Sequence, residues 1–156
     1  MGDSHTSRQE SGPSLISVEL PFQTVLPAHY ITDREMRMRL YRRMAELDNE
    51  HDVKTMLAEL TDRFGPAPQP VHNLIFQLRV KLRAHRAHVD SIGCEQEMIS
   101  IRCPQSKNES MRDKLLAALP PDTRIAREKV WISTTGMQQE WEQRLLRSLD
   151  ILAAID

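Results

Sequence analysis

The side chains best suited to metal chemistry lie between residues 85 and 103. His85 and His88 are three residues apart in a helix-like run, and Cys94 and Cys103 follow downstream. Two imidazoles and two thiolates form a ligand set that Zn²⁺ accepts. However, the cysteines do not form a Cys-x₂₋₄-Cys knuckle, and Cys103 falls on the inward face of an expected strand, where cysteine commonly serves as a small buried apolar group. The sequence therefore predicts no metal site.

A second group of candidate residues is basic. Arg79, Arg83 and Arg86 share one stripe of the same helix-like run and are candidates for contact with phosphate. No aromatic residue lies between them to stack on a base. A solvated face is the favoured reading of this stripe, because cations near a helix C-terminus complement the helix dipole. A small nucleic-acid-binding module using this face is the alternative function.

A third group is acidic. At about 100° per residue, Glu59 and Asp62 lie opposite the apolar stripe of the preceding helix, with Thr55 on the same side. Two carboxylates beside small side chains can accept an arginine of a partner protein in bidentate fashion. From the helical pattern alone, a solvated helix face is the favoured reading of these residues.

The sequence gives no support for catalysis. Its five glycines never form the Gly-rich arrays that cradle phosphates, and no Gly-x-Ser-x-Gly elbow occurs. Nothing in the pattern gathers a nucleophile, a base and an orienting group at one point. We therefore predict a non-catalytic protein that needs no cofactor.

Composition bounds the class of protein. The chain has 156 residues, 28% of them charged and 40% hydrophobic, which is ordinary for a globular domain. Its net charge of −1 argues against direct DNA binding, since phosphate contacts need excess Lys and Arg on one surface. With two cysteines and no long apolar run, a cytoplasmic protein without membrane contact is expected. Residues 1–14 are polar and predict a tail or linker, and residues 15–156 predict a single domain.

The first half of the chain predicts one strand and three helices. The stretch "LISVELPF" alternates apolar and polar residues, and Pro21 confines this strand to a sheet edge. Helices are expected at about residues 33–47, 50–63 and 71–88. Thr32 and Glu35 predict a capping box for the first helix. Met36, Met38 and Met44 are expected as core filler.

The join between the second and third helices is the most specific local signal. The second helix should bury one apolar stripe, made of Val53, Met56, Leu57, Leu60 and Phe64. Gly65 lies where a left-handed cap belongs, with Asn49 available as the N-terminal cap. Pro66 forbids continuation, and Pro70 suits the first turn of the next helix. The third helix should face inward through Val71, Leu74, Ile75, Leu78 and Leu82. Such a proline-braced helical hairpin fixes an interhelical angle and presents a surface.

After residue 88 the spacing of apolar residues changes from a helical pattern to the alternation typical of strands. "VDSIG" and "EMISIRC" predict two short strands, and "TRIAREKVWIST" predicts a β-hairpin after a short helix. Thr135 and Gln138 are expected to cap the last helix. The predicted fold class is α+β: an N-terminal edge strand, a three-helix segment with the proline-braced hairpin, then β-β-α-β-β-α forming a small sheet packed by helices.

Two stretches of the chain, "LPAHYITDREMRMRLYRRMAEL" and "ELTDRFGPAPQPVHNLIFQLRVKLRA", resemble the C-terminal domain of bacterial transcription-repair coupling factors. The family pattern has Leu/Ile-Pro-x-x-Tyr-Ile, then Arg-Leu-x-x-Tyr-Arg-Arg with a tolerated shift, then Leu-x-Asp-Arg-Phe-Gly-x-x-Pro. The matching residues are Leu26, Pro27, Tyr30 and Ile31; Arg39, Leu40, Tyr41, Arg42 and Arg43; and Leu60, Asp62, Arg63, Phe64, Gly65 and Pro68. The resemblance covers about residues 16–155 and is most specific through residue 88.

The resemblance implies a regulatory role. The parent proteins look like ATP-driven DNA translocases that displace stalled RNA polymerase and recruit excision-repair proteins, through modules upstream of this domain. For the domain itself the resemblance implies autoinhibition, by docking on an N-terminal damage-recognition-like module and masking its repair-scaffold-binding surface. RNA polymerase and excision-repair proteins would then be indirect partners. The acidic residues before Arg-Phe-Gly, here Glu59 and Asp62, are implied in that contact. If the chain is encoded alone, it would instead be a remnant or a trans-acting regulator.

Overall fold

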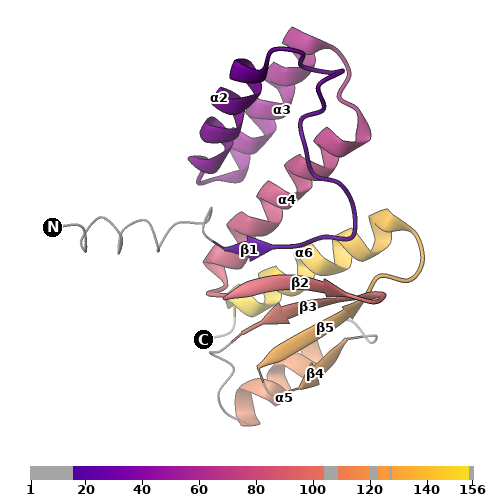
Figure 1. Ribbon diagram of the computed structural model, residues 1–156. Coiled ribbons are helices and arrows are strands. Elements are labelled where there is room, and N and C mark those ends of the chain that lie inside the picture. Colours follow the sequence, from indigo (N-terminus) through magenta and orange to yellow (C-terminus); the bar gives the residue numbers. More distant parts are fainter. Residues whose placement is uncertain (1–15, 104–108, 120–122, 127, 155–156) are drawn as a thin grey trace, which may run out of the picture.

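The computed structural model describes residues 16–103, 109–119, 123–126 and 128–154 (Figure 1). The predicted tail at 1–14 lies outside these residues. The elements in chain order are β1 (Ser17–Val18), α2 (Arg34–Ala45), α3 (Glu50–Phe64), α4 (Gln69–Arg86), β2 (Ser91–Glu95), β3 (Met98–Arg102), α5 (Glu109–Ala118), β4 (Arg124–Ala126), β5 (Lys129–Ser133) and α6 (Gln138–Ala154). This order confirms the predicted α+β class.

The strands form one sheet in the order β1-β2-β3-β5-β4. β1 pairs in parallel with β2, and the other pairs are antiparallel. The edge position of β1 is confirmed, but β1 spans only two residues rather than the whole predicted alternation. The chain leaves the sheet before Pro21, which has no N–H to donate. Phe22 then packs against Trp141 and Phe76, with ring centroids 5.7 and 6.3 Å away.

Helices cover one face of the sheet, and α5 and α6 lie behind the strands in Figure 1. The covered face carries the inward side chains of the central strands: Ile92, Ile99, Ile101, Val130 and Ile132. They pack on α6 residues, among them Trp141, Leu145 and Leu149. This sheet cluster is one of two apolar cores.

The second core, the helical cluster, lies between α2, α3 and α4. It includes Leu40 and Met44 from α2 and the predicted stripe of α3, of which Val53, Met56 and Leu60 are fully buried. Met38, by contrast, is 46% exposed, so its predicted place in the core was wrong. Met38 lies two residues before the buried Leu40, which is about 200° around a helix of 3.6 residues per turn and so on the far side.

Helix α4 belongs to both cores. Its predicted face, represented by Val71 and Leu74, lies in the helical cluster. A second face, made of Phe76, Val80 and Ala84, is buried in the sheet cluster. Sequence periodicity identified only the first face. α4 is therefore the element that joins the two halves of the molecule (Figure 1).

The predicted hairpin between α3 and α4 is confirmed. Asn49 caps α3 by accepting the Asp52 N–H, and Gly65 ends that helix at φ +91°. Pro68 is the N-terminal cap residue of α4, and Pro70 lies in its first turn.

Two other predicted caps were wrong. The α2 cap is Asp33, whose carboxylate accepts the Glu35 N–H, and not Thr32. At α6 the Met137 N–H donates to the Glu140 carboxylate at 3.1 Å, and Gln138 donates to Glu142 rather than pairing with Thr135. At both helix N-termini several polar side chains could accept the same free backbone N–H groups. The backbone conformation decides which side chain does so.

Candidate partner-binding site

The outer face of α3 carries the predicted acidic pair. Thr55 and Asp62 are exposed on the side away from the helical cluster. The Thr55 hydroxyl donates to the His51 carbonyl of its own helix at 3.1 Å. In the described part of the chain, nothing forms an ion pair or side-chain hydrogen bond with the Asp62 carboxylate. Asp62 therefore offers an open carboxylate.

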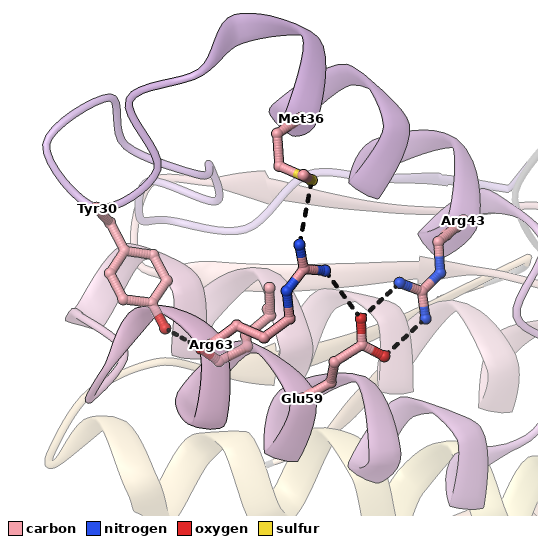
Figure 2. A network of polar contacts seen from close by, with 6 residues as sticks. Tyr30, Met36, Arg43, Glu59 and Arg63 are labelled. Carbon is pink, nitrogen blue, oxygen red and sulfur yellow. Dashed lines mark hydrogen bonds and ion pairs between the residues drawn. The ribbon is translucent and has the colours of Figure 1, made fainter.

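Glu59 is placed differently from the prediction. Arg43 of α2 donates two hydrogen bonds to its carboxylate, at 2.7 and 3.0 Å, and Arg63 lies 3.4 Å away (Figure 2). The hydrogen bond from Arg43 holds the pKa of Glu59 below its ordinary value, against the opposing effect of burial. The Glu59 side chain is only 31% exposed. Of the predicted pair, Asp62 is open to a partner, whereas Glu59 already pairs within the chain.

Arg63 is fixed on several sides. Besides Glu59, it donates to the Met36 sulfur at 3.8 Å (Figure 2). Its guanidinium also lies 5.1 Å from the centre of the Phe64 ring. A cation over an aromatic face is attracted by the ring quadrupole. Arg63 therefore links α2 to the end of α3.

The two motif tyrosines tie the entering chain to the helices. The Tyr30 hydroxyl donates to the carbonyls of Gly65 at 2.7 Å and Leu60 at 3.1 Å, and its ring packs edge-on against Phe64. Burial raises the pKa of Tyr30, so the hydroxyl keeps its proton and remains a donor. The Tyr41 hydroxyl accepts the Leu26 N–H at 2.7 Å. These motif residues hold α3 in place.

The basic stripe of α4 is largely occupied. Arg79 and Arg83 both donate to the Glu50 carboxylate, at 3.0 and 2.7 Å, and Arg83 also pairs with Asp150 of α6. Arg83 is 17% exposed, so it does not lie on a solvated face. Of the three arginines only Arg86 is exposed without an ion pair among the described residues. The stripe gives a phosphate-binding role little support.

The candidate zinc ligands are not gathered at one point. His85 and His88 are exposed, whereas Cys103 is buried. Burial, with a smaller contribution from the Asp90 charge, raises the pKa of Cys103 to about 12, so its thiol stays protonated. Among the residues that the structure describes, no three His, Cys, Asp or Glu side chains are grouped to hold a metal ion. Within the same residues, no helix has the length and apolar character needed to cross a membrane.

Comparison with known proteins identifies a family that this chain resembles. Residues 20–114 match the sequence model of the TRCF domain. The chain is 31% identical over 100 residues to the transcription-repair-coupling factor of Rickettsia typhi, covering 64% of this chain and 9% of that protein. It is 34% identical over 80 residues to that of Mycobacterium bovis, covering 51% of this chain and 6% of that protein.

The chain thus spans about a tenth or less of the curated relatives named here. Its fold is that of a crystal structure of the C-terminal domain of transcription-repair coupling factor, with a TM-score of 0.75 and 21% identity over 88% of this chain and 91% of that chain. The match to the domain model covers more than half of the chain. The chain therefore belongs to the TRCF-domain family, as a domain of the transcription-repair coupling factors of DNA repair.

Proposed function

We propose that the chain is a non-catalytic regulatory domain that docks through the outer face of α3. Its partner is the N-terminal damage-recognition-like module of the same or a cognate coupling factor, and docking masks the repair-protein binding surface of that module. The observation that carries the proposal is the open Asp62 carboxylate, which lies one turn beyond a Glu59 side chain fixed by two arginines.

The geometry gives the two acidic residues different roles. A carboxylate offers about four lone-pair sites, and arginine N–H groups already occupy three positions on Glu59. Glu59 therefore positions Arg43 and Arg63, and Asp62 accepts the arginine of the partner. Thr55 lies about two turns before Asp62 on the same exposed side and contributes contact area.

Such docking is weak enough to be reversible. An exposed ion pair contributes about 0–1 kcal/mol, so small apolar surfaces such as Ala58 must share the stabilisation. A difference of about 5.5 kcal/mol between two states is enough to move their ratio from 1:99 to 99:1. A modest docking energy can therefore hold a closed state that a competing partner reopens.

The test is calorimetric titration of the chain with the separately expressed N-terminal module of the cognate factor. Asp62→Arg places like charges together, and we expect at least tenfold weaker binding. Asp113→Arg reverses an exposed charge on α5, at the other end of the molecule, and should leave the affinity unchanged. Equal affinity of Asp62→Arg and the unmodified chain would remove the proposed surface.

A further inference from the structure

The uncovered face of the sheet has an unusual composition. Strand alternation turns one set of side chains toward the helices and leaves the other set outside. Two of the three cross-strand rows of this outer set carry its cations and its tryptophan: Gly93, Ser100, Trp131 and Arg124 in one, Arg102 and Lys129 in the next. We call these residues the sheet platform. No described helix lies in front of the strands in Figure 1.

Trp131 is the centre of the sheet platform. Trp141, the other tryptophan of the chain, is 4% exposed, whereas Trp131 is only partly buried. On one side of Trp131 the row continues with the small residues Ser100 and Gly93, where a Cβ added to Gly93 would lie 3.4 Å from the Ser100 hydroxyl. Ser100 is only 7% exposed, although none of the described helices lies on this face. Trp131 is its direct partner across the strands.

Three cations surround the indole. The Lys129 ammonium lies over the Trp131 ring, 5.2 Å from its centre, so a base that stacks on this face takes the place of the ammonium. Arg124 lies directly across from Trp131. Arg102 lies directly across from Lys129 on the other side. Within the described residues, none of the three forms an ion pair with a carboxylate. From strand spacings of about 4.8 Å and rises of about 3.4 Å per residue, the cations span about 12 Å.

We propose that the sheet platform binds single-stranded DNA, with a base stacked on Trp131 and phosphates held by the flanking cations. Single-stranded nucleic acid exposes base faces to an aromatic side chain, whereas a duplex keeps them stacked inside. An acidic peptide would use the cations but has no need of the indole. Ser100, the hydroxyl beside the indole, is nearly buried and so is poorly placed to read a ribose 2′-hydroxyl.

The net charge of the whole chain does not reveal this basic surface. The net charge of −1 averages over acidic residues that lie elsewhere, whereas three cations without an ion pair to any described residue meet on one face. Glu95 is the acidic residue of β2 on that face, and it lies at the strand end, paired with Met98 rather than with a platform residue. The platform is also far from α3 (Figure 1), so it is independent of the proposed docking surface.

The test uses a fluorescent thymidine homopolymer of about 15 nucleotides, within the range that a single-strand-binding fold covers, and anisotropy at low salt. Three phosphate contacts predict a slope of log K against log salt of about −2, since each contributes about −0.7 on single strands. Trp131→Ala should weaken binding about tenfold, and Trp131→Phe should retain most of it. Arg102→Gln should make the slope shallower by about 0.7.

Arg86→Gln is the matched control. It removes one exposed positive charge from α4, the same change in net charge as Arg102→Gln, and should leave binding unchanged. Circular dichroism checks that each variant is folded. No binding at low salt, sensitivity to Arg86 but not to Arg102, or tighter binding of RNA, duplex DNA or polyglutamate would each overturn the proposal. Trp131→Ala should keep the affinity of the unmodified chain for the N-terminal module. Its effect on DNA binding can then be told apart from an effect on docking through α3.

Discussion

Glu50 shows how one side chain can connect three helices. It begins α3 and accepts hydrogen bonds from Arg79 and Arg83 of α4, while Arg83 continues to Asp150 of α6. Burial alone would raise the pKa of Glu50, but hydrogen bonds and charges from Arg83 and Arg79 outweigh it, so the pKa lies below its ordinary value. Two of the three arginines considered as phosphate contacts, Arg79 and Arg83, therefore stabilise the fold.

Replacing this carboxylate tests its contribution. We expect Glu50→Gln to lower the free energy of unfolding in urea by about 1–3 kcal/mol. This value lies between the typical contributions of an exposed and of a buried ion pair. Glu35→Gln is the control, because its 3.7 Å pair with Arg39 is exposed. It should cost no more than about 0.5 kcal/mol.

The same variant has a pH signature. A carboxylate with a depressed pKa in the folded state stabilises the protein above its ordinary pKa of 4.5, and loses that contribution as pH falls through the folded value. The stability difference between the unmodified chain and Glu50→Gln should thus be full at neutral pH and shrink below about pH 4.5. The check is to measure the urea midpoints of the unmodified chain and of Glu50→Gln at neutral pH and again below about pH 4.5. A difference that stays constant with pH would contradict the assigned ion pairs.

At the scale of elements, α3 shows what sequence can predict. Its apolar period, Asn49 cap and terminal Gly65 are all local signals, and all were found in the structure. The second face of α4 was missed, although Phe76, Val80 and Ala84 follow one another at spacings of four. One apolar stripe satisfies a helix pattern, so a second is overlooked unless both are sought.

The candidate site was predicted less well than the fold. The exposure of Asp62 follows from its position on α3, but the pairing of Glu59 depends on how closely α2 approaches. Arg43 is sixteen residues away in sequence, and local spacing does not report such distances. Strand alternation likewise predicts which side chains share a face of the sheet. Only the placement of α5 and α6 shows which of the two faces these helices cover.

The end of α3 gives a prediction at this scale. Gly65 has φ +91°, and a Cβ added there would meet no heavy atom within 4 Å, so Gly65→Ala meets backbone strain without a clash. We expect a loss of about 1–3 kcal/mol in thermal or urea unfolding. Gly93→Ala, in a strand with ordinary backbone, is the control and should change stability by less than about 1 kcal/mol. Equal effects of the two substitutions would mean that the bend of the hairpin does not require glycine.

At the scale of the whole molecule, α4 makes the two cores interdependent. Val71 and Leu74 are buried in the helical cluster, whereas Val80 and Ala84 are buried in the sheet cluster, all on one continuous helix. Loss of packing on one side removes support for the helix that the other side packs against. The molecule should therefore unfold as a single cooperative unit.

A cavity far from the sheet tests this coupling. Leu60 is fully buried in the helical cluster, and Trp141 reports from the sheet cluster, in a Trp131→Phe background that leaves it as the remaining tryptophan. Leu60→Ala should cost about 2–5 kcal/mol and lower the urea midpoint of Trp141 fluorescence and of far-UV circular dichroism together. Leu116→Ala, at a side chain 54% exposed on α5, should leave both midpoints in place. If Leu60→Ala shifts the dichroism while the Trp141 transition stays put, the two cores unfold separately and α4 does not couple them.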